Sequence, residues 1–215
     1  MYLKRQKAPK NWPITRKGTA YIVLPRSDIT KGLPLLIILR NMLKLAQDRR
    51  EVKKALVRKD ILLNNKVIKD EKRGVLLFDI IKIVPAKKYY RLTLSENGKF
   101  ELEEIKENES KHKVAKIINK KMLKGNKMQI NLNDGRNILS ENKFKVNDSV
   151  LVNLESNKIE KTLPLQERAK VMVIGGKHSG KRGEVVKIDS EKGMSEIKTE
   201  KENVNVLIKQ LMILN

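Results

Sequence analysis

Residues 33–46, L-P-L-L-I-I-L-R-N-M-L-K-L-A, open the segment that decides the fold of this chain, which runs to residue 84. Pro34 stands at the first helical position, where the missing amide of proline costs least. Arg40 and Lys44 follow one turn apart. The remaining residues recur at the spacing of one apolar helical face, and they are Leu35, Leu36, Ile38, Leu39, Met42, Leu43 and Ala46. We therefore predict a helix that buries this face and exposes the two cations.

A second, shorter helix is predicted over residues 49–58, R-R-E-V-K-K-A-L-V-R. Its apolar stripe consists of Val52, Ala55 and Leu56, at helical spacing. The cations on its outer face are Arg50, Lys53, Lys54 and Arg58.

The sequence that follows these helices indicates a small sheet. Residues 61–68, I-L-L-N-N-K-V-I, predict a β-hairpin, because Asn64 and Asn65 can take the positive φ angles of a tight turn. Residues 76–84 are apolar and β-branched and predict a buried strand. Two packed basic helices on a small sheet are typical of a small RNA-binding module.

The charge of the whole chain points to the same kind of partner. Among 215 residues, 48 Lys and Arg face 25 Asp and Glu, which gives a net charge of +23. Such an imbalance destabilises a compact chain through self-repulsion, so we interpret it as the sign of a polyanionic partner, most often nucleic acid. A generally lysine-rich proteome is the alternative explanation. Aromatic residues make up only 4 % of the chain, which favours two or three small aliphatic cores.

Several classes of protein are disfavoured by composition. The chain has no Cys and only two His, so disulfides and thiolate metal sites are excluded and a zinc centre is not expected. Its longest apolar run, residues 33–39, falls short of the roughly 20 residues that a membrane helix needs. The N-terminal residues carry charge without an apolar signal core, so we expect a cytoplasmic protein.

Residues 1–32 are expected to form a basic N-terminal extension. Residues 1–17 contain cations and no acid, which predicts an extended segment until a polyanion neutralises it. Trp12, the only tryptophan, has two interpretations. It either fastens the segment to the protein body or stacks on a base or sugar of RNA.

Residues 87–165 are predicted to form a β-rich central domain. Tyr90, Leu92 and Leu94 alternate with polar residues, as in a half-buried strand. Residues 101–109 then hold five glutamates, the only acidic patch of the chain. We expect this patch to face away from the polyanion or to meet a basic protein.

Residues 166–215 are predicted to form a small barrel in which two strands flank a glycine-rich loop. The loop sequence G-G-K-H-S-G-K is close to a phosphate-binding loop, but position 182 is Arg instead of Ser or Thr. A strand pattern also follows the loop, so no helix N-terminus would point at a phosphate. The segment instead resembles the KOW motif of ribosomal proteins and transcription elongation factors, and the matching residues are Lys170, Val171, Gly175, Gly180, Gly183 and Val185.

No catalytic constellation is recognised. Residues 135–137, G-R-N, are similar to the G-R-L-D of pseudouridine synthases, but Asp134 precedes the arginine instead of following it. Asp79 is a lone carboxylate among apolar residues, which favours a structural role. We therefore expect no enzyme, no cofactor and no small-molecule substrate.

Taken in order, these segments resemble the S4e family of archaeal and eukaryotic small-subunit ribosomal proteins. Besides the KOW segment, the resemblance is carried by L-K-R-Q-K-A-P-K-N-W-P-I (residues 3–14), residues 33–46, R-E-V-K-K (50–54), F-D-I-I-K-I (78–83), N-L-N-D-G-R-N (131–137) and K-V-N-D (145–148). It implies a multi-domain α+β fold. The expected parts are an S4-like RNA-binding domain of helical hairpin and sheet (33–86), the central β domain (87–165) and an SH3-like KOW β-barrel (166–215).

The resemblance also implies a function: a structural constituent of the small ribosomal subunit that binds small-subunit rRNA beside neighbouring ribosomal proteins. A transient KOW-type RNA-binding factor of the ribosome or of transcription is the alternative. The residues expected to contact RNA are Lys4, Arg5, Lys7, Lys10, Trp12, Arg16 and Lys17 in the N-terminal segment, Arg40, Lys44, Arg50, Lys53, Lys54 and Arg58 in the helical hairpin, and Lys177, His178, Lys181 and Arg182 in the barrel loop.

Overall fold

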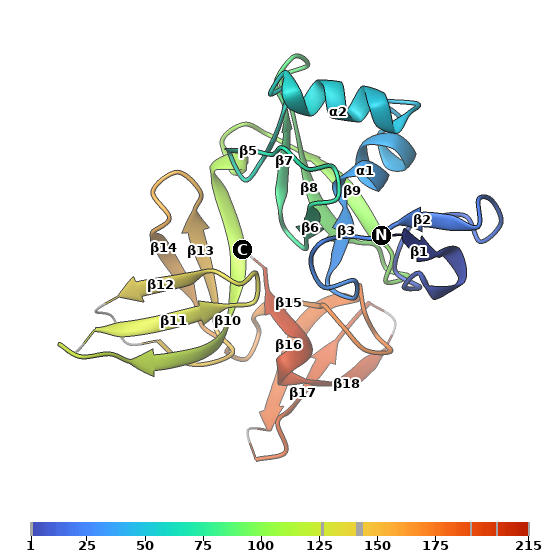
Figure 1. Ribbon diagram of the computed structural model, residues 1–215. Helices are drawn as coiled ribbons and strands as arrows, with labels where there is room; N and C mark the ends of the chain where they lie inside the picture. Colours follow the sequence, from blue (N-terminus) through green and yellow to red (C-terminus); the bar gives the residue numbers. More distant parts are fainter. Residues whose placement is uncertain (1, 126, 141–143, 190, 201, 215) are drawn as a thin grey trace. The chain divides into compact units, whose positions relative to one another are not determined.

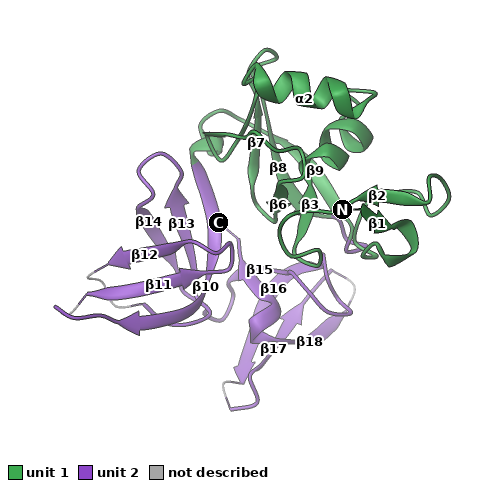
Figure 2. Cartoon of the chain, in the orientation of Figure 1, with its two compact units in different colours: residues 1–94, 99–111 green, residues 95–98, 112–215 purple. Residues whose placement is uncertain are grey.

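The protein is mostly β-structure with few helices (Figure 1). The computed structural model describes residues 2–125, 127–140, 144–189, 191–200 and 202–214. The chain divides into two compact units (Figure 2), which are Met1–Leu94 with Lys99–Lys111 and Ser95–Gly98 with His112–Asn215. The expected α+β class is therefore borne out only in its coarse sense, because the helical part is small.

The part of unit 1 that the structure describes forms three sheets. A five-stranded antiparallel sheet has the order β5-β4-β7-β8-β9 and lies beside two pairs, β1-β2 and β3-β6. The strands are β1 (Tyr2–Lys4), β2 (Tyr21–Val23), β3 (Gly32–Pro34), β4 (Ile61–Leu63), β5 (Lys66–Val67), β6 (Gly74–Leu76), β7 (Ile80–Ile83), β8 (Lys88–Leu94) and β9 (Phe100–Ile105).

The first predicted helix is shorter than expected. It consists of α1 (Leu35–Ile37) and a π-helical turn (Ile38–Met42). The amide of Leu45 donates to the carbonyl of Leu39, and Lys44 between them takes a left-handed φ of 52°. The prediction that Arg40 and Lys44 share one helical face is wrong, because the helix has ended before Lys44.

The second predicted helix is confirmed as α2 (Arg49–Val57). Its N-terminus is stabilised by Glu51, whose carboxylate accepts hydrogen bonds from the amides of Gln47 and Asp48. Val52 and Leu56 are buried in the core of unit 1, as the periodicity predicts.

The predicted hairpin is also confirmed. Leu63 pairs with Lys66 across a two-residue turn, in which Asn64 and Asn65 have φ angles of 50° and 61°. The side chain of Asn64 then donates to Asp79 over 2.7 Å.

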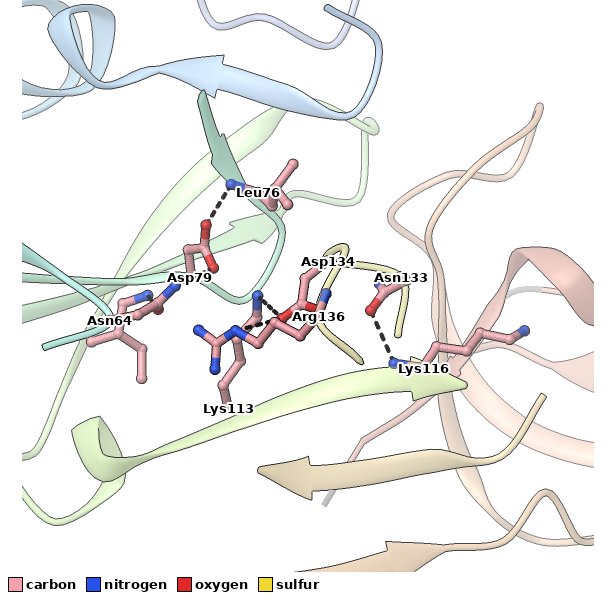
Figure 3. Close-up of polar contacts among 9 residues, drawn as sticks. Asn64, Leu76, Asp79, Lys113, Lys116, Asn133, Asp134 and Arg136 are labelled. Atoms are coloured by element: carbon pink, nitrogen blue, oxygen red, sulfur yellow. Dashed lines mark hydrogen bonds and ion pairs between the residues drawn. The ribbon is translucent and has the colours of Figure 1, made fainter. Parts of the chain in front are cut away.

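The strand predicted over residues 76–84 is interrupted. It divides into β6 and β7, because Phe78 adopts a φ of 62° and breaks the extended run. At this break the carboxylate of Asp79 accepts a hydrogen bond of 2.7 Å from the amide of Leu76 (Figure 3). This contact confirms the structural role predicted for Asp79.

The described residues of unit 2 form two five-stranded antiparallel sheets. Their orders are β12-β11-β10-β13-β14 and β18-β17-β16-β15-β19, and each contributes its own apolar core. The strands are β10 (His112–Met122), β11 (Met128–Leu132), β12 (Asn137–Ser140), β13 (Ser149–Asn153), β14 (Ile159–Leu163), β15 (Lys170–Val173), β16 (Arg182–Asp189), β17 (Met194–Lys198), β18 (Asn203–Leu207) and β19 (Leu211–Ile213).

The border between compact units differs from the expected border at residues 86–87. That position lies between β7 and β8, which pair with each other from Ile80↔Arg91 to Ile83↔Lys88. Strands β8 and β9 therefore belong to the sheet of unit 1, although the four residues Ser95–Gly98 at the hairpin tip group with unit 2. Strand alternation in the sequence reveals a strand but not the sheet that it joins.

Candidate nucleic-acid interface

The N-terminal segment is folded back on itself. Strands β1 and β2 pair in antiparallel register, with Lys4 opposite Tyr21. The guanidinium of Arg5 donates to the carbonyl oxygens of Thr19 and Thr15, over 2.6 and 2.7 Å, and to the hydroxyl of Thr19 over 2.9 Å. The expectation of an extended segment is therefore wrong for this part of the chain, since β1 pairs with β2 and Arg5 donates to backbone oxygens of the same segment.

This fold creates a basic pocket of about 540 Å³, which we call the N-terminal pocket. Its cations are Lys4, Arg5, Arg16 and Lys17, four of the residues predicted to contact RNA. The rest of its lining is Gln6, Gly18, Thr19, Ala20 and Tyr21, so no acid lies among the lining residues. Lys7 and Lys10 are exposed but do not line it.

Trp12 does not belong to this exposed surface. Its side chain is only 2 % exposed and packs in the core of unit 1. A ring that is buried in this way has no free face for a base, so the prediction of RNA stacking is corrected to the other interpretation, in which Trp12 fastens the segment to the protein body.

The outer face of α2 carries Arg50, Lys53 and Lys54, with Arg58 directly after the helix, and all four are exposed. None of the four forms an ion pair with any described residue. Arg49, by contrast, pairs with the buried Glu71, and its Nε lies 2.8 Å from that carboxylate. The helix thus uses one cation for its own anchoring and keeps four free for a partner.

The two cations predicted on the first helix are less favourably placed. Arg40 is partly buried, and its Nε donates to the side-chain oxygen of Asn41 over 3.0 Å. Lys44 is exposed but stands beyond the helix end.

The barrel loop lies between β15 and β16, which confirms the strand–loop–strand prediction and leaves no helix after the glycines. Lys177 and Arg182 are exposed, and His178 is partly buried. Lys181 pairs with Glu202 over 2.5 Å, and this hydrogen bond, together with the attraction of Lys181, holds the pKa of Glu202 below its usual value. Sequence reasoning missed this acid, which follows the loop by about twenty residues.

Gly180 has a structural role in the same loop. Its φ is +91°, and a Cβ atom there would lie 1.9 Å from the carbonyl oxygen of Ser95, a residue of the same unit. The glycine therefore accommodates the tip residues Ser95–Gly98 instead of leaving its backbone open to a ligand.

The carboxylates that could suggest catalysis are engaged in structural contacts. In the turn between β11 and β12, Asp134 accepts a hydrogen bond from Lys113 of β10 over 3.0 Å and pairs with Arg136 over 3.3 Å (Figure 3). Burial alone would raise the pKa of Asp134, but attraction to Lys113 and the hydrogen bond from the amide of Arg136 hold the pKa below its usual value. The N-D-G-R sequence therefore builds a buried ion pair.

The acidic segment formed by β9 and the residues that follow it is partly neutralised by β8. Arg91 pairs with Glu109 over 2.7 Å, and Lys88 pairs with Glu104 over 3.5 Å. Glu101 and Glu103 remain exposed on β9.

Neither a candidate metal site nor a membrane-spanning helix is found among the described residues. Among them, no group of three or more His, Cys, Asp or Glu side chains could hold a metal ion. None of the helices that they form is long and apolar enough to span a membrane.

Comparison with known proteins decides the family. The model of ribosomal family S4e matches residues 86–159, and the KOW motif matches residues 168–209. The small ribosomal subunit protein eS4 of Methanocella arvoryzae is 37 % identical over 190 residues, which cover 87 % of this chain and 80 % of that protein. This chain belongs to the ribosomal S4e family.

Other S4e proteins agree with this assignment. The small ribosomal subunit protein eS4 of Nanoarchaeum equitans is 35 % identical over 195 residues, which cover 87 % of this chain and 83 % of that protein. The crystal structure of the 30S ribosomal protein S4e from Thermoplasma acidophilum has the same fold, with a TM-score of 0.74 over 86 % of this chain and 95 % of that one, at 24 % identity. The S4e and KOW resemblances are thereby confirmed, and membership of a ribosomal protein family confirms that the chain is not an enzyme.

Proposed function

We propose that this protein is a structural constituent of the small ribosomal subunit that binds and stabilises small-subunit rRNA in the cytoplasm. The observation that carries the proposal is the outer face of α2, where three exposed cations, with Arg58 directly after the helix, stand without an acidic partner among the described residues. Relatives named small ribosomal subunit protein eS4 support it.

The physical mechanism is neutralisation of phosphates. Each Lys or Arg that meets a phosphate releases condensed counterions from the RNA, which makes binding favourable and dependent on salt. A helix cannot read bases in the deep major groove of A-form RNA, so the α2 face binds backbone and shape. The N-terminal cations and the exposed loop residues Lys177 and Arg182 add further phosphate contacts. His178 and the paired Lys181 take a lesser part.

The acidic strand β9 fits the second class of partner, a basic neighbouring ribosomal protein. Glu101 and Glu103 stay exposed on a strand at the edge of its sheet. Their charge would repel RNA, so this strand faces protein in the assembled subunit.

The proposal is tested by salt dependence and by co-sedimentation of the full-length protein. We expect binding to purified small-subunit rRNA to weaken steeply with salt. Each phosphate contact should contribute about 0.7 to 0.9 to the slope of the logarithm of the binding constant against the logarithm of the salt concentration. We also expect stoichiometric retention on small subunits through a sucrose gradient after a moderate salt wash. An affinity that salt does not change would contradict the proposal.

The KOW match over residues 168–209 favours one alternative, a factor that visits the ribosome or the transcription machinery transiently. The same gradient separates the two functions. A transient factor would leave the small subunit in the salt wash, whereas a constituent stays bound.

A further inference from the structure

We propose that the N-terminal pocket binds one unpaired nucleotide of RNA, with its phosphates held by Lys4, Arg5, Arg16 and Lys17 and its base stacked on Tyr21. The inference rests on the proposed function, since it names a site within the RNA-binding surface. It assigns to the segment a built pocket in place of a flexible basic tail.

The charge of the pocket requires an anion. Four cations line one depression of about 540 Å³, and no acid lines it. Lys4, Arg16 and Lys17 are exposed and form no ion pair with the described residues. Like charges that converge in this way repel one another until an anion neutralises them. A phosphate-bearing ligand meets this requirement.

Arg5 gives the pocket a fixed wall. Three hydrogen bonds to Thr15 and Thr19 hold its guanidinium, which has five N–H donors in all. Gly18 suits this arrangement, because its φ of +141° is one that L side chains rarely adopt and a Cβ atom there would press on Nη2 of Arg5 at 3.0 Å. The guanidinium is therefore oriented before any ligand arrives, and its remaining donors suit a phosphate.

Tyr21 supplies a surface for a base. Its side chain is 60 % exposed, although the next residue of β2, Ile22, is buried in the core of unit 1. Strand alternation thus holds the ring outward, and Tyr21 also lines the pocket. Lys4 stands directly opposite Tyr21 in the strand register.

An exposed ring beside converging cations is the combination by which proteins hold single-stranded nucleic acid. A base within a duplex is stacked on both faces and cannot meet the ring, so the ligand is a nucleotide from a loop, bulge or end.

The test is photochemical crosslinking of the full-length protein to purified small-subunit rRNA, followed by nuclease digestion and mass spectrometry. We expect a nucleotide adduct on Tyr21. Tyr21→Leu removes the adduct and weakens RNA binding about five-fold or more, whereas Tyr21→Phe keeps the affinity within about two-fold because it keeps the ring face. Tyr2→Leu is the matched control, since Tyr2 is 63 % exposed on the paired strand but does not line the pocket.

A second variant reports on the cations. Arg16→Gln with Lys17→Gln should lower the logarithmic salt slope by about 1.4 to 1.8, the share of two phosphate contacts. If Tyr21→Leu and this double variant both bind like the wild type, while the wild type keeps its steep salt dependence, the pocket assignment is overturned and the proposed function stands. If the wild type does not bind small-subunit rRNA, the proposed function itself fails.

Discussion

The side-chain amine of Lys116, on β10, donates a hydrogen bond to the backbone carbonyl oxygen of Leu211, at the start of β19, over 2.8 Å. A second bond of 2.5 Å reaches the carbonyl oxygen of Ile208. Lys116 is 3 % exposed, and its burial lowers the pKa from an ordinary value of 10.5 to about 8. One buried amine thus joins the sheet that contains β10 to the sheet that contains β19, both in unit 2.

The lowered pKa of Lys116 predicts that stability rises at alkaline pH. Between pH 8 and about 10.5 the unfolded chain binds the proton of this amine while the folded chain has released it, so the free energy of unfolding increases with pH. The largest gain from this group is about 3 kcal/mol. The free energies of unfolding of the wild type and of Lys116→Met, measured by denaturant titration, should therefore diverge over this pH window. If the two free energies change with pH in parallel, the prediction is contradicted.

Breaking the buried pair of Lys113 and Asp134 should destabilise unit 2. Asp134→Leu leaves the amine of Lys113 in the interior without this carboxylate, and we expect the free energy of unfolding to fall by about 3 to 5 kcal/mol. Because the folded-state pKa of Asp134 is lowered, its contribution is present above the unfolded pKa and is lost as the pH falls through the folded value. The double variant Lys113→Met with Asp134→Leu should recover much of the loss, as measured by denaturant titration.

Gly180→Ala should destabilise unit 2 more than a glycine substitution with equal backbone strain. The new Cβ would overlap the carbonyl oxygen of Ser95, in addition to the strain of about 1 to 3 kcal/mol at a positive φ. Gly135→Ala is the control, because Gly135 has a φ of +85° but nothing lies within 4 Å of its Cβ position. Equal melting temperatures of the two variants would argue against the close approach.

Trp12→Ala should loosen the N-terminal segment. The substitution removes a buried ring from the core of unit 1, and losses of about 3 to 5 kcal/mol are typical of such sites. We expect faster amide hydrogen exchange in β1 and β2 and a lower melting temperature by circular dichroism, with Trp12→Phe between the two. Unchanged exchange would show that the ring does not anchor the segment.

Charge reversal on α2 should weaken RNA binding without affecting the fold. Lys53→Glu with Lys54→Glu removes two proposed phosphate contacts, so the logarithmic salt slope should fall by about 1.4 to 1.8. Both side chains are exposed, and the melting temperature should stay near that of the wild type. The control is Lys69→Glu with Lys87→Glu. It makes the same change in net charge at exposed positions that are not among the residues predicted to contact RNA. If both pairs reduce affinity equally, the α2 face has no special role.

Local sequence chemistry predicted the elements whose causes are local. Helix α2 follows from the spacing of Val52 and Leu56, and the hairpin turn follows from Asn64 and Asn65. The early end of the first helix was not predictable, because its apolar face continues to Ala46 while the backbone departs at Lys44. A burial pattern reports which side of the chain is covered, and it does not report a change of φ.

The candidate site shows the same limit. The four cations of the N-terminal pocket were predicted one by one from their charge. That they line one pocket depends on the pairing of β1 with β2. Tyr21 was missed because its exposure becomes visible only when Ile22 is known to be buried. Long-range pairing, such as that of Lys181 with Glu202, leaves no local signal in the sequence.

The contacts of Lys116 also limit when the two sheets of unit 2 can be joined during synthesis of the chain. Its two carbonyl partners lie 92 and 95 residues further along the chain. At roughly 5 to 20 residues per second of synthesis, the nascent β10 waits several seconds before Ile208 exists. During that time the amine of Lys116 lacks both of these acceptors. These contacts between the two sheets of unit 2 therefore form only in a chain translated through β19, and a product truncated before that strand would leave the buried amine of Lys116 without these two acceptors.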